Sequence, residues 1–244
     1  MLELKNVSVG PCKILDNVNI AFCKGITAVI GVNSAGKSTL LKAASGEISC
    51  DGEVLLNGKN IKSYKSKQKA DILAFLPQVL PSPSLTVREV VGFAFYKEKV
   101  RLSENERLLV DQKLAEFGAL HLADRVVSSL SGGERQKVFL CMVLLQNANV
   151  LLLDEPTTYM DIAFKPTLYK ALRSEAEKGK TVVAVMHDLS DAVEIADNIA
   201  LISNGKLAFY GSKQECLEQG IIEKEFSVER FTLKTGEEEI IMFK

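Results

Sequence analysis

Apolar and polar residues alternate along the N-terminal part of the chain. The segments LELKNVSV (2–9) and ILDNVNIAF (14–22) carry an apolar residue at about every second position, and a Lys24-Gly25 turn precedes the apolar run ITAVI (26–30). Alternation with a period of two predicts strands with one buried face. We therefore expect an antiparallel β subdomain that leads into a buried strand.

The pattern changes to helical spacing after Lys37 and stops near Gly46, so a helix is predicted directly behind the buried strand. The segment GEVLLNGKNI (52–61) contains the Asn-Gly pair typical of a hairpin, and ILAFLPQ (72–78) predicts a buried strand stopped by its proline. A strand, a glycine-rich loop and a helix thus follow one another early in the chain.

Residues from Ser84 to about Ala123 show helical spacing without an intervening strand. Two helices are predicted there, one within 85–96 that begins with a threonine cap and one that runs from a Ser103…Glu106 capping box to Gly118. We expect this block to form a helical subdomain, residues 79–143, inserted into an α/β core.

Strands and helices alternate again beyond the helical block. VLLLD (150–154) and TVVAVMHD (181–188) predict buried strands, each followed by a helix, and IALISNGKLAFYG (199–211) predicts a hairpin. The C-terminal residues mix helix and short strand around an acidic GEEE turn (236–239). We expect one domain, residues 1–244, made of a core (1–78 and 144–212), the helical subdomain (79–143) and a short C-terminal extension (213–244).

Composition and charge narrow the class of protein. The chain has 244 residues, of which 47% are apolar, and its net charge of −1 gives no sign of binding to nucleic acid. Its apolar runs fall short of the ~20 residues of a membrane span, and its N-terminus lacks the pattern of a signal peptide. We expect a cytosolic protein that reaches a membrane only by docking. The cysteines form no C-x-x-C pair and are expected to be reduced and mostly buried: Cys12, Cys23, Cys50, Cys141 and Cys216.

The segment GVNSAGKST (31–39) lies between the buried strand and the helix. Its spacing Gly31-x4-Gly36-Lys37-Ser38 fits a phosphate-binding loop, in which backbone N–H groups surround phosphate oxygens, the lysine reaches the outer phosphates and the hydroxyl ligates Mg²⁺. The alternative is a glycine-rich turn that matches by chance, but such a turn needs neither the strand nor the helix. We therefore predict a phosphate site.

Two acidic residues, Asp154 and Glu155, follow the apolar run within VLLLDEP (150–156). In a phosphate-loop ATPase the first acid holds Mg²⁺, and the second is placed to orient or deprotonate the attacking water. An acidic turn after a strand is common, so this motif gains its weight from the phosphate loop ahead of it.

Further residues are candidates for contact with the nucleotide. Ser131, Gly132 and Gly133 precede a helix, where N–H groups and the helix dipole face an approaching anion, although such a segment is more often only a helix cap. Gln78 and His187 end predicted strands, at the edge where doubly wound sheets bind ligands, although such residues are commonly structural.

Taken in order, these motifs resemble the full set of an ATP-binding-cassette (ABC) ATPase, and the resemblance covers residues 2 to about 212. The segments DEPTTYMDI (154–162) and LTVREVV (85–91) are most similar to the subunits that power importers of ferric siderophores, haem and cobalamin. The resemblance implies an α/β fold with a phosphate-loop (RecA-like) core, an N-terminal antiparallel β subdomain and an inserted helical subdomain.

The resemblance further implies that two copies of the chain pair head to tail. ATP would lie between the phosphate loop of one copy and Ser131, Gly132 and Gly133 of the other, and Asp161 would bridge the two copies. The remaining nucleotide contacts implied are those of the whole phosphate loop: Gly31, Val32, Asn33, Ser34, Ala35, Gly36, Lys37, Ser38 and Thr39.

The same resemblance implies the catalytic roles. Glu155 would be the general base, His187 would contact the γ-phosphate, and Gln78 would touch Mg²⁺ and the attacking water while sensing a transmembrane partner. Mg²⁺ would be held by Ser38, Gln78 and Asp154. ATP and Mg²⁺ are thus the implied cofactors.

For partners, the resemblance implies an integral-membrane permease docked on the helical subdomain and, indirectly, an extracytoplasmic substrate-binding protein. The chain would lie on the cytoplasmic face of the membrane. Its ATP hydrolysis would drive uptake of an iron-siderophore, haem or cobalamin type substrate. A nucleic acid partner is not implied.

Three features depart from the family pattern. Where an aromatic residue usually precedes the phosphate loop to stack on adenine, this chain has VGPC (9–12), so stacking and selectivity for ATP over GTP are not implied. Ser34 and Val32 replace a frequent glycine and proline, and we expect both to be tolerated because the loop uses backbone N–H groups. Pro166 should delay the helix after Asp161, because a proline beyond the first turn costs ~3 kcal/mol.

Two other functions compete with import. A soluble cassette ATPase in an assembly or repair process would need no permease, and a helical lobe with mostly charged exposed faces would favour it. A phosphate-loop GTPase or kinase fits poorly, because the segment around Ser131 would then have no purpose.

Overall fold

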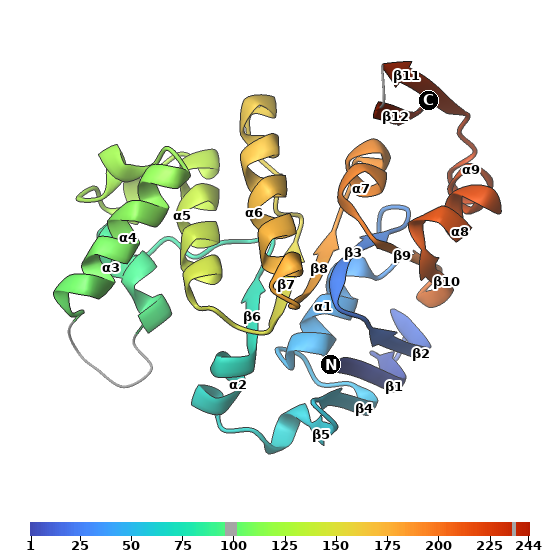
Figure 1. Ribbon diagram of the computed structural model, residues 1–244. Helices are drawn as coiled ribbons and strands as arrows, with labels where there is room; N and C mark the ends of the chain where they lie inside the picture. The colour runs from blue at the N-terminus through green and yellow to red at the C-terminus, as the bar shows by residue number, and fades with distance from the viewer. Residues whose placement is uncertain (96–101, 236–237) are drawn as a thin grey trace.

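The computed structural model describes residues 1–95, 102–235 and 238–244. Two expectations extend beyond these ranges: the end of the helix predicted over 85–96, and the GEEE turn at 236–239. The other predicted strands and helices are present, and Figure 1 shows them arranged around a central sheet, with a group of helices at one end and a C-terminal hairpin near the other.

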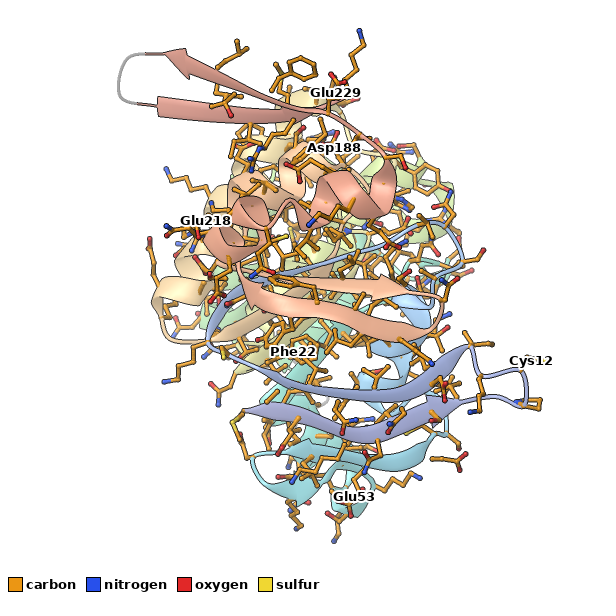
Figure 2. All side chains as sticks on the ribbon, turned by 90° about the vertical axis from the view of Figure 1, so that its right-hand side faces the viewer. Cys12, Phe22, Glu53, Asp188, Glu218 and Glu229 are labelled. Atoms are coloured by element: carbon orange, nitrogen blue, oxygen red, sulfur yellow. The ribbon has the colours of Figure 1, made fainter. Side chains whose placement is uncertain are left out.

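The alternating N-terminal segments form a four-stranded antiparallel sheet in the order β2-β1-β4-β5. Most of its apolar positions are buried, among them Phe22, which Figure 2 labels. The Phe22 ring meets that of Tyr210 of the main sheet edge to face, with ring centroids 6.2 Å apart. The predicted β subdomain therefore packs beside the core. Its strands are β1 (Leu2–Val9), β2 (Leu15–Phe22), β4 (Asp51–Leu56) and β5 (Lys59–Asn60).

The main sheet has six strands in the order β10-β9-β3-β8-β7-β6, in which β10 alone runs antiparallel to its neighbour. Every residue of β7 and β8 is buried, as expected for parallel strands covered on both faces. The strands are β3 (Gly25–Ile30), β6 (Leu73–Leu76), β7 (Val150–Asp154), β8 (Thr181–Val185), β9 (Asn198–Ser203) and β10 (Lys206–Ser212).

Helices cover both faces of this sheet. One face packs with the antiparallel sheet and α1, while the opposite face packs with α6 and α7. As expected from Pro166, α6 begins at Lys165, which leaves the proline in the first turn, where its missing N–H costs no helical hydrogen bond. These helices are α1 (Lys37–Ser45), α2 (Ser66–Ile72), α6 (Lys165–Glu177) and α7 (Leu189–Ile195).

The helical block predicted from the sequence forms a lobe of α3 (Val87–Gly92), α4 (Glu104–Glu116) and α5 (Gly132–Leu145), on the left of Figure 1. Thr86 and Ser103 cap the first two helices as predicted. In the described part of 79–143, β-structure is limited to a single bridge. One apolar core runs from this lobe into the main sheet, so the boundaries of a separate subdomain remain a prediction.

The C-terminal extension ends in a hairpin that packs on α7. Its elements are α8 (Lys213–Glu218), α9 (Ile221–Phe226), β11 (Arg230–Thr235) and β12 (Glu238–Phe243). Short 3₁₀ turns occur at Ile61–Ser63, Phe93–Phe95, Leu120–Leu122, Val127–Ser129 and Ile162–Phe164.

The expectation that most cysteines are buried is wrong. All are free, but burial is found only for Cys141 and Cys216, while Cys50 is half-buried and Cys12 and Cys23 are exposed. Cys12 lies at the tip of the loop between β1 and β2 (Figure 2), and Cys23 follows an edge strand, so neither reaches the core. Within the described ranges, each helix is too short or too polar to cross a bilayer.

Candidate nucleotide-binding site

The phosphate loop connects β3 to the first turn of α1, as its sequence predicts. α1 begins after Gly36, and no side chain caps its first turn, so its N–H groups and positive dipole end are open to an anion. Gly36 has φ 106°, and a Cβ there would lie 2.8 Å from the carbonyl oxygen of Ile14. Glycine is therefore required at this position by both backbone conformation and space.

Lys37 folds back over this loop. Its Nζ donates to the carbonyl oxygens of Gly31 at 2.8 Å and Val32 at 3.0 Å, and the residue is only 5% exposed. Burial lowers the pKa of Lys37, and the nearby carboxylates of Glu155 and Asp154 act in the opposite direction. The Lys37 amine is thus held at the loop by two carbonyl oxygens, where phosphate oxygens would replace them as its acceptors.

Ser34 occupies a strained position in the loop, with φ 65°. The left-handed conformation costs a residue with a Cβ about 1–2 kcal/mol, which explains in physical terms why glycine suits this position. Our expectation that serine is tolerated stays a prediction, and the left-handed backbone gives the substitution an energetic cost that the sequence pattern did not reveal.

Asp154, the last residue of β7, lies directly beside Ser38. The Ser38 hydroxyl donates to Oδ1 of Asp154 at 2.9 Å, while Oδ2 is buried and has no hydrogen-bond partner among the described residues. Burial raises the pKa of Asp154, an effect opposed by the Ser38 hydrogen bond and increased by the charge of Glu155. A buried carboxylate with one unpaired oxygen next to a hydroxyl is suited to an oxygen-ligated cation such as Mg²⁺.

The side chain of Glu155, which follows β7, contacts residues that follow the two neighbouring strands, β6 and β8. Its Oε2 accepts from Nε2 of Gln78 at 2.7 Å and from the hydroxyl of Thr158 at 3.2 Å, and its Oε1 lies 2.6 Å from Nε2 of His187. The residue is 7% exposed and has φ 53°, a second strained backbone conformation in this site. The predicted catalytic residues therefore form one cluster at the carboxyl ends of β6, β7 and β8.

An open pocket of about 580 Å³ joins the loop to this cluster. Sequence reasoning did not identify Ile14, which lines the pocket from the loop between β1 and β2 and is half exposed. Its place in the sequence could have indicated this role, because Ile14 lies two residues beyond the VGPC segment, where the resemblance described above would place an aromatic residue. The pocket is lined by Ile14, Asn33, Ser34, Gly36, Lys37, Ser38, Thr39, Gln78, Glu155 and His187.

Ser131, Gly132 and Gly133 do not line this pocket. Ser131 caps α5 in a capping box, in which its hydroxyl donates to Oε2 of Glu134 at 2.8 Å and accepts from the Glu134 N–H at 3.3 Å. The Ser-x-x-Glu spacing was readable in the sequence and was missed. The bond from the Ser131 N–H holds the pKa of Glu134 below its usual value, so a carboxylate is present at this helix start.

Asp161 also lies outside the pocket, exposed at the start of a 3₁₀ turn. Tyr159, two residues before Asp161, packs against the Ser131–Gly133 segment: its ring lies against Gly132 and its carbonyl oxygen lies against Gly133. One chain thus carries a phosphate-loop half-site and a separate exposed segment, Ser131 to Gly133.

The fold and the site define a class of protein: a phosphate-loop nucleotide-binding ATPase with an inserted helical lobe. The chain belongs to the ABC transporter family, whose family model matches residues 15–158. The prediction of the family is thereby confirmed, and with it the predictions of the fold class and of an ATPase.

Individual relatives cover nearly the whole chain. The iron(3+)-hydroxamate import ATP-binding protein FhuC of Bacillus subtilis is 36% identical over 93% of this chain and 87% of that protein. The hemin import ATP-binding protein HmuV of Bradyrhizobium diazoefficiens is 35% identical over 94% of this chain and 89% of that protein. The bacterial ABC transporter cassette MJ0796, solved as a dimer, is similar with a TM-score of 0.79 and 26% identity, over 87% of this chain and 99% of that chain.

Proposed function

We propose that this chain is the ATP-hydrolysing subunit of a membrane importer for a siderophore or haem type iron chelate. The observation that carries the proposal is the cluster of Gln78, Glu155 and His187 beside an uncapped helix start and Lys37. The relatives named for hydroxamate and hemin import support the substrate class. The same names disfavour the alternative of a soluble cassette without a permease.

Phosphate binding would use groups that are already aligned. The backbone N–H groups of the loop and of the first turn of α1 would surround the phosphate oxygens, with Lys37 on the outer phosphates. The loop segment 31–39 would supply the nucleotide contacts through its backbone more than through its side chains. Ile14 would provide an aliphatic wall in the same pocket.

Hydrolysis would use Glu155 as the general base. A water oxygen attacks the γ-phosphorus, the bond to the bridging oxygen breaks, ADP leaves with that electron pair, and the water proton passes to the Glu155 carboxylate. His187 would contact the γ-phosphate, and Gln78 would orient the water. Both residues now contact the Glu155 carboxylate, so at least one of these contacts has to open to admit the water.

Mg²⁺ fits the residues beside the phosphate loop. We propose that Ser38, Asp154 and Gln78 would hold it, because Asp154 has an unpaired buried oxygen beside the Ser38 hydroxyl. A bound Mg²⁺ would neutralise charge on the phosphate oxygens. It would also offset part of the cost of burying the Asp154 carboxylate, to which Lys37 and Lys42 already contribute favourable charge.

A second copy of the chain would complete the site. Ser131, Gly132 and Gly133 are not among the described residues that line the pocket of their own chain, and the related cassette MJ0796 was solved as a dimer. We propose a head-to-tail homodimer in which this segment reaches the nucleotide of the second copy and Asp161 bridges the copies. The Ser131 hydroxyl would then exchange its bond to Glu134 for a phosphate oxygen.

A permease would dock on the helical lobe and near Gln78. Exposed apolar side chains favour a protein contact over a fully solvated lobe; they are Val79, Phe93, Leu108, Leu109, Leu120 and Val126. Docking there would place the chain on the cytoplasmic face of the membrane. A substrate-binding protein outside the cell would deliver the chelate.

The test is to tag the chain in its native cell, solubilise the membranes in mild detergent and identify co-purifying proteins by mass spectrometry. Recovery of a polytopic permease is expected, and binding of a ferric siderophore or haem by its companion protein would assign the substrate class. Recovery of soluble partners alone would overturn the import proposal. A matched preparation carrying Leu108→Ser and Leu109→Ser should recover less permease if the lobe is the docking surface.

A further inference from the structure

Two contacts join the first turn of α5 to the segment that follows Glu155. Nε2 of Gln136 donates to the carbonyl oxygen of Pro156 at 3.3 Å, and a Cβ on Gly133 would lie 2.6 Å from the carbonyl oxygen of Tyr159. Gln136 is 2% exposed, so this amide is held inside the protein. The helix that begins with the Ser131–Gly133 segment is therefore packed directly on the backbone behind Glu155.

The chemistry of proline makes the Gln136 bond important. Pro156 has no N–H, so its carbonyl oxygen is the one hydrogen-bonding group that it can offer. Glu155, the residue before it, has the strained φ of 53°. The Glu155 side chain is held by Gln78, His187 and Thr158. On the backbone, the Glu155 carbonyl accepts from the Thr158 N–H, and the carbonyl of Pro156, the next residue, accepts the hydrogen bond from Gln136.

We propose that Gln136 is a positioning residue for Glu155, acting through the carbonyl of Pro156. This inference rests on the proposed function, in which Glu155 is the general base and the Ser131–Gly133 segment contacts the nucleotide of a second copy. Gln136 lies three residues beyond Gly133 on the same helix. A shift of the α5 start on contact with one nucleotide would thus move the backbone next to the base of the other site.

The test compares Gln136→Met with Gln146→Met in the purified full chain. Methionine keeps the length of glutamine and removes the donor. Gln146 is a matched control because it ends the same helix, and its amide also donates to backbone carbonyls, those of Ala70 at 2.7 Å and Leu73 at 3.3 Å, away from the pocket. We expect Gln136→Met to lower kcat at least tenfold with KM for ATP within twofold, and Gln146→Met to keep kcat within twofold.

Gln136→Glu provides a second variant if Gln136→Met does not fold. A protonated carboxyl can donate to Pro156 and a carboxylate cannot, and burial at this 2% exposed position raises the pKa of a carboxyl, so the kcat of this variant relative to wild type should rise as the pH falls from 8 to 5. A ratio of the two kcat values that does not change with pH would overturn the proposal. So would an unchanged kcat in Gln136→Met, or an equal loss of kcat in both methionine variants.

The outcome for the unmodified chain separates the two proposals. If the wild type hydrolyses no ATP, either alone or with its permease, the proposed function itself is contradicted, whatever the Gln136 variants do. An active wild type with an active Gln136→Met would remove the positioning role alone.

Discussion

Nε2 of His187 lies 2.6 Å from Oε1 of Glu155, although the two residues follow different strands of the main sheet. Nε2 of Gln78 occupies the other carboxylate oxygen at 2.7 Å. These two partners of the carboxylate come from the segments expected to contact the γ-phosphate and to sense the permease, while Thr158, three residues beyond Glu155, is the third partner. If Glu155 is the base, as we propose, its carboxylate stays occupied until at least one of those segments moves.

Replacing Glu155 with glutamine removes the proton acceptor but keeps the size of the side chain. General-base catalysis contributes about 10²–10⁴ in rate, so E155Q should lower kcat at least a hundredfold while ATP affinity stays within threefold. Steady-state phosphate release and isothermal titration with ATP would measure the two effects. Glu89→Gln, in the capping box of α3, is the control. Turnover by E155Q close to that of wild type would exclude Glu155 as the base.

Ser34→Gly should relieve the strain at φ 65° without removing a ligand group. We expect the free energy of unfolding to rise by about 0.5–1 kcal/mol, because relief of strain exceeds the added entropy of the unfolded chain. ATP hydrolysis should stay within twofold of wild type, since the loop uses its backbone N–H. Chemical denaturation checks the first expectation. Ser227→Gly, at φ 53° far from the site, should give a similar gain; a large loss of ATP binding in S34G alone would assign a ligand role to the Ser34 hydroxyl.

Ile14→Tyr tests whether the aliphatic wall limits nucleotide affinity. An aromatic ring in contact with a base contributes about 1 kcal/mol, which corresponds to roughly fivefold in Kd. We expect tighter binding of both ATP and GTP, because stacking does not read the edge of the base. Cys12→Tyr places the same ring at the exposed tip of this loop and should change neither affinity. Equal affinities for wild type and I14Y would place the base away from Ile14.

The Glu175–Lys180 pair is buried, and a second lysine, Lys178, also contacts Glu175. Burial raises the pKa of Glu175, but hydrogen bonds from Lys178 and Lys180 outweigh this effect, and the net pKa lies below 4.5. The ionised form is thus favoured in the folded state. Its stabilisation is present above the unfolded pKa and is lost as the pH falls through the folded pKa.

Lys180→Met should therefore lower the free energy of unfolding at pH 7 by about 3 kcal/mol, since it leaves a buried carboxylate with one partner fewer. The difference from wild type should shrink as the pH falls through the folded pKa of Glu175, which lies below its usual value, because the carboxylate then becomes protonated. Urea unfolding at several pH values measures the loss of stability at pH 7 and its decrease at low pH. Lys178→Met, whose side chain is largely exposed, should cost under about 1 kcal/mol. A deficit of K180M that is independent of pH would instead indicate a packing effect.

Local signals were sufficient to predict most elements of the core. Glycine spacing, apolar runs and strand ends placed the phosphate loop, Asp154, Glu155 and His187, because each signal lies within a few residues of the feature it defines. Strand alternation likewise predicted the antiparallel sheet.

Contacts between distant segments could not be predicted in this way. Gln136 reaches Pro156 and Ile14 enters the pocket only because the fold brings separate segments together. The prediction that most cysteines are buried failed for a related reason, because Cys12 lies at a loop tip and Cys23 follows an edge strand. Backbone strain at Ser34 and Glu155 is equally invisible to a pattern of residue types.

The position of β3 has a consequence for synthesis of the protein. β3 is flanked by β8 and β9, whose residues Thr181–Ser203 leave the ribosome long after Gly25–Ile30. The strand that supports the phosphate loop therefore remains unpaired in the main sheet while about 150 further residues are translated. Such long-range strand pairing is slow and leaves apolar surface exposed until it forms. α3, α4 and α5 make contacts close in sequence and emerge earlier. A nascent chain would thus acquire its helical lobe before its capacity to hold nucleotide, which requires β8 and β9 to have emerged.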